Sequence, residues 1–227
     1  MKKLYGNTVG LKASQIRRLE NFYRRRIQPQ FLISAELTRD LNLLSHEIRR
    51  QIGLLINRQG KVAYVIVGDQ KKIVIPPITE YRAAPGRLKG LRCIHTHLTS
   101  EALSDDDLTD LSLLRLDIMA TVTNGQTESR PQIHVAHILP KNADNAPYRI
   151  LDPLSPSQLN IDCLAMIQAL ENELARRSKG YSADSGRERA LLASVSSTSQ
   201  RKALESLAEL KALATSNRIE IVGTLVQ

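Results

Sequence analysis

Two apolar runs separated by a short turn constrain the fold of this chain more than any other feature of its sequence. Residues 52–57 and 62–67 each form a run of six, and the segment between them contains Arg58, Gln59 and Gly60. Runs of this length that are bounded by turn residues are typical of β-strands, and their close succession predicts a hairpin. A lone hairpin is at best marginally stable in water, so further strands or a helix must pack against it.

Apolar segments and amphipathic stretches around the hairpin supply these further elements. Three stretches repeat apolar residues at helical spacing and predict helices, with Ser34 and Ser104 placed to cap the second and third. The sequence therefore predicts an N-terminal domain of the mixed α/β class over residues 1–150, built on a mixed sheet. The expected helices cover residues 11–23, 35–51 and a segment from 105, and the expected additional strands cover residues 73–75, 91–95, 118–122 and 133–139.

A linker and a second, smaller module are expected after this domain. The stretch 140–156 is rich in proline, asparagine and aspartate, so we expect a linker and then a connecting helix over residues 151–180. Residues 181–227 predict a β-α-β unit. One such unit cannot cover both faces of a parallel sheet, so we expect that it packs on the first domain or that the natural protein continues past Gln227.

Composition excludes several classes of protein. The 227 residues are 42% hydrophobic and 24% charged, which is ordinary for a globular protein with its own core. No apolar run approaches the roughly 20 residues that a bilayer span requires, and the basic N-terminus lacks the apolar region of a secretion signal. Cys93 and Cys163 are two cysteines without CxxC spacing. We therefore expect a cytoplasmic protein with reduced thiols and no membrane partner.

Positive charge is concentrated in the first part of the chain. Residues 1–100 hold 19 Lys and Arg against 6 Asp and Glu, whereas residues 101–150 hold 4 against 8. The run Arg24, Arg25 and Arg26 is the densest cluster, and its field attracts phosphate groups over a Debye length of about 8–10 Å. This run predicts electrostatic nucleic-acid binding, with a solvated helix face as the alternative. Base stacking is poorly supported, because few aromatic residues lie near the run in the sequence.

One group of residues has the pattern of a metal site. His95 and His97 are two apart at the end of the expected strand 91–95, so both imidazoles project from the same face. Asp107 lies in the first turn of the next expected helix, where a carboxylate can join two neutral imidazoles around zinc. The alternative is structural: the two imidazoles hydrogen-bond Asp107 or Ser104 and tie the strand to the helix.

The pattern HxH…SxxD of these residues resembles the metal-binding motif of the JAB/MPN (JAMM) metalloproteases and the RadC proteins. The order of elements also resembles the JAB/MPN fold, and the resemblance implies a zinc-dependent hydrolase. The chain departs from that motif in three respects. Leu98 stands where the motif has proline, Ser104 and Asp107 each come one residue early, and Arg49 and Gln51 stand near the place of the catalytic glutamate. Without that glutamate, no side chain is placed to take a proton from a zinc-bound water.

A second resemblance extends over nearly the whole chain, which is similar to the N-terminal part of HflX-type GTPases with an extended N-terminus. The final matching segments are similar to the opening β-α-β unit of the HflX domain. The segments that carry the resemblance are residues 6–12, 19–20, 23–26, 51–53, 65–69, 81–82, 86–92, 95–98, 104–111, 188–192, 206–210 and 221–227.

The HflX resemblance implies that the chain is the N-terminal accessory region of a longer, ribosome-associated GTP-binding protein. In that family the β-α-β unit continues into a glycine-rich segment, a helical hairpin and the G domain, which binds GTP and Mg²⁺. The sequence contains no GxxxxGK[ST] phosphate loop and no GxGxxG motif, so no nucleotide site is expected within these residues. The implied partners are the large ribosomal subunit or its RNA, and the missing G domain.

Overall fold

The structure is a computed structural model that describes residues 3–81, 84, 86–124, 131–140, 146–159, 162–182, 189–194, 200–217 and 219–226. The chain divides into two units between Ser178 and Lys179. Within the described residues, the first unit contains a mixed sheet of seven strands and the second contains a parallel pair of strands. The predicted mixed α/β class is therefore confirmed.

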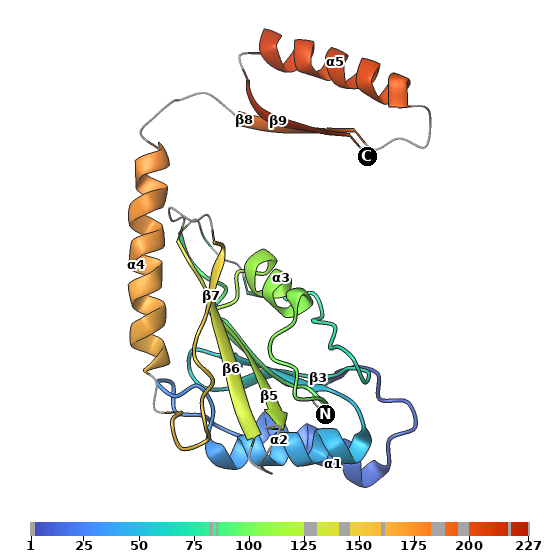
Figure 1. Ribbon diagram of the computed structural model, residues 1–227, viewed down its shortest axis with the longest axis vertical. Coiled ribbons are helices and arrows are strands. Elements are labelled where there is room, and N and C mark those ends of the chain that lie inside the picture. The colour runs from blue at the N-terminus through green and yellow to red at the C-terminus, as the bar shows by residue number, and fades with distance from the viewer. Residues whose placement is uncertain are drawn as a thin grey trace. The chain divides into compact units, whose positions relative to one another are not determined.

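The sheet of the first unit has the strand order β1-β3-β2-β4-β5-β6-β7 (Figure 1). The pairs β1 with β3 and β4 with β5 are parallel, and the other neighbours are antiparallel. The predicted hairpin is formed by β2 and β3. The strands are β1 (Leu4–Gly6), β2 (Ile52–Asn57), β3 (Val62–Val67), β4 (Leu91–Thr96), β5 (Ile118–Asn124), β6 (Pro131–Ile138) and β7 (Tyr148–Ile150).

Gly60 closes the hairpin in a backbone conformation that other residues rarely adopt. Its φ is 74°, and a Cβ on this residue would lie 1.7 Å from the carbonyl oxygen of Ile27. The N–H of Ile27 donates to the carbonyl of Gly60 at 2.9 Å. The hairpin turn is therefore held against the segment that follows the first helices.

Helices cover both faces of the sheet (Figure 1). Side chains alternate along β4, so that Thr96 meets Ser45 of α2 on one face, with 2.6 Å between the hydroxyl oxygens. On the other face, His95 lies 3.2 Å from Asp107 of α3. The helical elements that begin in this unit are α1 (Ala13–Asn21), the 3₁₀-helix η1 (Phe22–Arg24), α2 (Ala35–Ile48), α3 (Asp105–Leu113) and α4 (Cys163–Ser182), of which α4 extends past Ser178.

Two segments of the first unit differ from the sequence prediction. Residues 73–75 form no strand, because the side chain of Ile73 packs instead on Gly53 of β2, where a Cβ would lie 2.8 Å from its Cδ1. The stretch 140–156, predicted as a linker, contains β7, which extends the sheet by pairing with β6. Local composition cannot reveal this pairing, since β7 depends on the edge that β6 offers.

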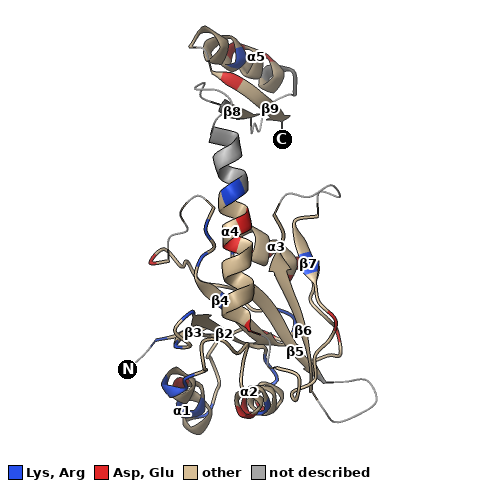
Figure 2. Ribbon diagram, turned by 90° about the vertical axis from the view of Figure 1, so that its left-hand side faces the viewer, with Lys and Arg blue, Asp and Glu red and all other residues tan. Residues whose placement is uncertain are grey.

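A buried network of charged side chains fixes α4 to the sheet, and α4 carries acidic residues (red in Figure 2). Arg58, in the hairpin turn, donates to Asp117 at 2.7 and 2.9 Å and to Glu171 of α4 at 2.7 Å. The side chain of Asp117 is 1% exposed and that of Glu171 is 3% exposed. Burial raises the pKa of Glu171, but hydrogen bonds from Arg58, the backbone of Leu88 and Arg87 outweigh it and lower the pKa to about 2.

The second unit has the predicted β-α-β arrangement. Its strands β8 (Arg189–Ser194) and β9 (Glu220–Val226) are parallel neighbours, and α5 (Gln200–Ser216) connects them. The helix packs through small and apolar side chains, which are Ala203, Leu207 and Ala214. None of the helices in the part of the chain that the structure describes combines the length and apolarity needed to cross a bilayer.

Removing the charge of Glu171 is expected to loosen α4 from the sheet. In Glu171→Gln, Arg58 stays paired with Asp117 but loses its second carboxylate, so the free energy of unfolding should fall by about 2 kcal/mol near pH 7. Because the folded-state pKa of Glu171 is lowered, its contribution is complete above the ordinary value of 4.5 and is lost as the pH falls toward about 2. Urea unfolding at pH 7 and at pH 3 measures both effects.

The matched control is Glu173→Gln, which removes the same charge from an exposed position on the same helix. Its effect should stay within about 0.5 kcal/mol. Equal effects of the two substitutions, or a Glu171→Gln effect that grows between pH 4.5 and pH 3, would contradict this role of Glu171.

Candidate metal centre

The central strand β4 holds the two imidazoles of the site in place. His95 lies between Gly53 of β2 and Thr121 of β5 in the register of the sheet, and its side chain is fully buried. His97 follows the strand directly, and its N–H donates to the carbonyl of Val122 at 3.0 Å. Neighbouring strands on both sides of β4 therefore fix the backbone at His95, and β5 fixes it at His97.

The N-terminus of α3 positions the carboxylate. Ser104 caps the helix, and its hydroxyl oxygen accepts the N–H of Asp107. In return, Oδ2 of Asp107 accepts the backbone N–H of Ser104 at 2.8 Å and its hydroxyl at 2.7 Å. This reciprocal capping box fixes the rotamer of Asp107 and directs the carboxylate toward the sheet.

Three potential ligand atoms from these residues converge. The Nε2 atoms of His95 and His97 are 3.0 Å apart, and they lie 3.2 and 3.4 Å from the two carboxylate oxygens of Asp107. When a single carboxylate oxygen is considered, the three atoms lie within 4.8 Å of one another. Ligands of tetrahedral zinc, with bonds of about 2.0–2.1 Å, lie roughly 3.3 Å apart. The separations therefore suit a small tetrahedral cation when both carboxylate oxygens of Asp107 share in binding it.

The hydrogen bonds of His97 define its tautomer. Its Nδ1 lies 2.9 Å from the carbonyl oxygen of Glu101, which can only accept, so Nδ1 carries a hydrogen. In a neutral His97 the lone pair of Nε2 can therefore accept a hydrogen from Nε2 of His95 at 3.0 Å or bind a metal ion. A second proton on His97 would instead form an ion pair with Oδ2 of Asp107, which lies 3.4 Å away.

The pKa values of His97 and Asp107 are both shifted by their mutual contact. Burial lowers the pKa of His97, but Asp107 and the carbonyl of Glu101 outweigh it, so the pKa is raised. Burial raises the pKa of Asp107, yet the hydrogen bonds to His95 and His97 hold that pKa far below its usual range. The carboxylate is thus ionised and available either as a metal ligand or as the partner of an imidazolium.

The surroundings of the cluster fit a metal ligand set in part. The bond from His97 to Glu101 orients its ring in the way that ligating histidines require. His95 departs from this rule, because its buried Nδ1 has no hydrogen-bond partner within the described ranges. Two imidazoles and one carboxylate also leave the fourth tetrahedral position to a non-protein ligand. The sequence prediction of His95, His97 and Asp107 is thus realised as a spatial cluster.

At the two positions that the sequence aligned with the glutamate of the JAMM motif, the described residues offer no carboxylate. Gln51 stands beside β2, and its amide donates to the carbonyl of Lys71 at 2.8 Å. Arg49 is exposed and ends α2 with a φ of 52°. Neither Arg49 nor Gln51 can therefore accept a proton from a zinc-bound water.

The arginine run predicted to bind nucleic acid lies elsewhere in the first unit, beside β3. Arg25 forms ion pairs with Glu36 at 2.9 Å and Asp40 at 2.7 Å, both on α2. Arg24 and Arg26 are exposed. Two of the three predicted arginines thus face solvent, while the third helps to hold η1 against α2.

Sequence reasoning missed the polar network around Arg58 as well as the contact between Ser45 and Thr96. The partners in these contacts are separated by 51 to 113 residues, so no local spacing signals them. Comparison with protein-family models, curated proteins and solved structures found no match to this chain. Its functional interpretation therefore depends on the geometry described above and on the resemblances of its sequence.

Zinc binding is expected to need His95. After equilibration with zinc and gel filtration, chain purified without a polyhistidine tag should retain about one zinc per molecule by elemental analysis, and His95→Ala should retain little. Zinc at about 100 times its Kd should stabilise the wild type by roughly 2.7 kcal/mol. His46→Ala, on the opposite face of the sheet, is the matched control and should bind zinc like the wild type. Zinc well below one equivalent, unchanged by His95→Ala, would leave only the hydrogen-bonded alternative.

Proposed function

We propose that this chain is the N-terminal accessory region of an HflX-like, ribosome-associated GTP-binding protein. The nucleotide site of that protein lies outside these residues in this proposal, and the first unit contributes contacts to the large ribosomal subunit or its RNA. The proposal is supported by the resemblance of nearly the whole chain to the N-terminal part of that family. It is supported further by the parallel β8-α5-β9 unit, since the resemblance implies a β-α-β unit at this place.

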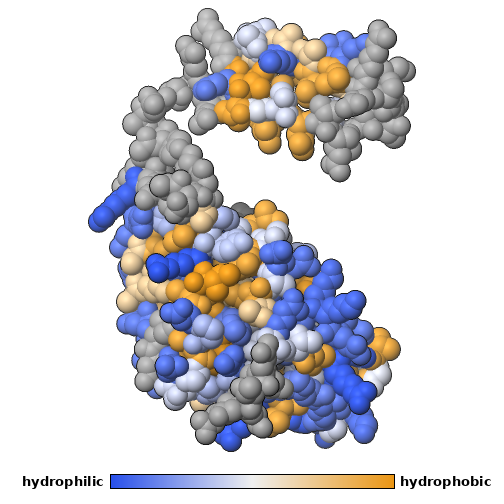
Figure 3. Space-filling model, in the orientation of Figure 1, coloured by the Kyte–Doolittle hydropathy of each residue, from blue (hydrophilic) through white to orange (hydrophobic). Residues whose placement is uncertain are grey.

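The observation that carries this proposal is the open face of the second unit. The helix α5 covers one face of the two strands, whereas Leu191 of β8 is 65% exposed and Leu225 of β9 is 56% exposed. Figure 3 shows apolar side chains on the surface of this unit. A parallel sheet normally has both faces covered. The exposed residues therefore suit a unit that further parts of an HflX-like domain complete.

The positive charge of the first unit supports the proposed contact with ribosomal RNA. The first 100 residues carry most of the positive charge of the chain, and Arg24 and Arg26 lie exposed on this unit. Exposed cations of this kind attract phosphate groups without reading a sequence. The expected contact with ribosomal RNA is therefore electrostatic and sensitive to salt.

Binding to the large subunit should depend on Arg24 and Arg26. Co-sedimentation with purified 50S particles is expected at about 50 mM salt, and the affinity should fall by at least about tenfold at 200 mM. The variant Arg24→Glu/Arg26→Glu should bind more weakly and show a shallower salt dependence. Arg149→Glu/Arg176→Glu makes the same change of charge at exposed positions outside the arginine run and serves as the control. Undetectable binding at about 50 mM, or equal weakening by both variants, would contradict the proposal.

A second candidate function is favoured by the convergence of His95, His97 and Asp107. In this alternative the first unit is a JAMM-like zinc hydrolase domain with a JAB/MPN-like fold. Zinc held by these residues would supply a Lewis acid and a water of lowered pKa at its fourth position. The residues near the place of the family's glutamate oppose turnover, because the amide of Gln51 bonds Lys71 and cannot act as a base. We therefore favour a zinc-holding domain without hydrolytic activity.

An assay of peptide hydrolysis distinguishes a zinc-holding domain without activity from a JAMM-like hydrolase. Zinc-loaded chain should leave linear and isopeptide-linked test substrates intact over hours, as judged by mass spectrometry, because neither Arg49 nor Gln51 can act as a general base. Turnover that requires zinc and disappears in His95→Ala would establish the hydrolase alternative instead.

A further inference from the structure

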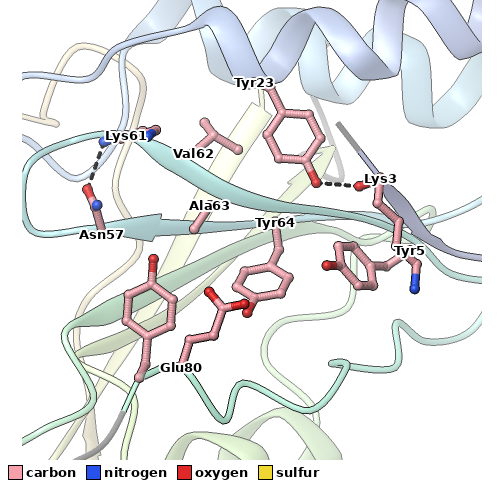
Figure 4. Close-up of a pocket in the computed structure, with 10 residues that line it drawn as sticks. Lys3, Tyr5, Tyr23, Asn57, Lys61, Val62, Ala63, Tyr64 and Glu80 are labelled. Atoms are coloured by element: carbon pink, nitrogen blue, oxygen red, sulfur yellow. Dashed lines mark hydrogen bonds between the residues drawn. The ribbon is translucent and has the colours of Figure 1, made fainter. Parts of the chain in front are cut away.

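Four tyrosines gather around one cavity at the edge of the sheet (Figure 4). The chain has only eight Phe and Tyr residues and no Trp, so this cavity holds half of its aromatic side chains. The cavity has a volume of about 320 Å³. It is lined by Lys3, Tyr5, Tyr23, Asn57, Lys61, Val62, Ala63, Tyr64, Glu80 and Tyr81.

The tyrosines come from segments that are far apart in the sequence. Tyr5 lies on β1, Tyr64 on β3 and Tyr81 in the loop before β4, and all three line the cavity; Figure 4 shows Tyr5 and Tyr64 beside one another in it. The ring centroids of Tyr5 and Tyr64 are 5.1 Å apart, and those of Tyr64 and Tyr81 are 6.3 Å apart. Tyr64 is 5% exposed and forms the inner wall. Tyr5 and Tyr81 are half-buried and therefore accessible to a ligand.

The tilt of the rings limits what the cavity can hold. Tyr64 is inclined by 49° to Tyr5 and by 59° to Tyr81, so no two neighbouring rings form a parallel slot. A flat aromatic ligand would stack on one accessible ring and meet the other rings at its edge. Tyr23 forms a wall of the cavity whose position is fixed by two hydrogen bonds. Its hydroxyl donates to the carbonyl of Lys3 at 2.6 Å and accepts the N–H of Val65 at 3.1 Å.

Positive charge lines the rim of this cavity. The ammonium of Lys3 lies 5.1 Å from the centroid of Tyr5, and Lys61 is exposed at the start of β3. Arg26 is the bridge partner of Lys61, which brings the arginine run next to the cavity. Glu80 is the one carboxylate among the lining residues. Aromatic faces beside a cationic rim are the combination that single-stranded nucleic acids bind.

We propose that this cavity binds an unstacked base of single-stranded RNA. The base stacks on Tyr5 or Tyr81, and the adjacent phosphates lie against Lys3, Lys61 and Arg26. The inference rests on the proposed function, in which ribosomal RNA is the partner, and it assigns to that contact a base-stacking site that the sequence did not indicate.

Glu80 gives the site a preference among bases. Its carboxylate is a pure acceptor, so it suits the two-hydrogen exocyclic amines of adenine, cytosine and guanine, whereas uracil offers it only the single N3–H. Oligo(A) is therefore expected to bind better than oligo(U).

The decisive comparison uses two probes of equal charge. An eight-nucleotide oligo(A) RNA and an abasic strand of the same length are titrated with the 227-residue chain, and fluorescence anisotropy is measured at about 100 mM salt. Stacking predicts tighter binding of oligo(A). Tyr5→Ala should weaken oligo(A) binding by about 5- to 100-fold and leave the abasic strand unchanged. Lys61→Glu should weaken both probes, because it acts on the phosphates.

Tyr148→Ala is the matched control, since Tyr148 is a half-buried tyrosine at the opposite edge of the same sheet. It should leave both affinities unchanged. Tyr81→Ala provides a second test in the cavity should Tyr5→Ala fold poorly, as judged by circular dichroism and thermal unfolding. Equal affinities for oligo(A) and the abasic strand, or equal effects of the cavity and control variants, would overturn the inference. Binding of a trimethyl-lysine peptide in place of RNA would also overturn it, because a set of tilted rings can cage an ammonium group.

The inference and the proposed function can fail separately. If 50S particles bind in a salt-dependent manner but oligo(A) shows no advantage over the abasic strand, the stacking site is wrong and the accessory role stands. If oligo(A) binding depends on Tyr5 but 50S particles do not bind, the stacking site stands and its assignment to ribosomal RNA is wrong.

Discussion

The arrangement of the first unit depends on one electrostatic constraint, the meeting of two imidazoles and a carboxylate between β4 and α3. His97 keeps a hydrogen on Nδ1 for the carbonyl of Glu101, so its other nitrogen presents a lone pair to His95 and Asp107. A hydrogen on Nε2 of His95, a second proton on His97 or a metal ion can satisfy this lone pair, and each of them links β4 to α3. We propose the metal ion, because it engages all three ligand atoms together, whereas a single proton lies between only two.

The alternation of side chains along the strands then determines which residues share a face of the sheet. Tyr64 of β3 and Cys93 of β4 are both partners of Leu55 in the sheet register, and Cys93 is two residues from His95. The tyrosine cavity and the metal cluster therefore share one face, while α1 and α2 cover the other. In our account this face is the functional surface of the unit. The cluster ties β4 to α3 on this face, and we propose that the cationic rim with its aromatic residues contacts RNA.

Patterns of local sequence predicted much of this structure. The hairpin, the caps at Ser34 and Ser104, and the β-α-β unit all follow from spacing within a few residues, and so does the projection of His95 and His97 from one face. Contacts between distant segments could not be read in this way. The seventh strand needs the edge of β6, and the network of Arg58 joins residues up to 113 positions apart. The tyrosine cavity was missed for the same reason, because β1, β3 and a loop must first be assembled.

The central proposal is that a metal ion, rather than a proton, lies between His95, His97 and Asp107, and X-ray absorption at the zinc edge tests it most directly. Our account predicts a first shell of about four nitrogen and oxygen ligands at roughly 2.0–2.1 Å, with the outer-shell scattering of two imidazoles. Asp107→Asn should alter this shell, because an amide is a weaker ligand than a carboxylate. A shell without imidazole scattering, or a spectrum that His97→Ala leaves unchanged, would contradict the account.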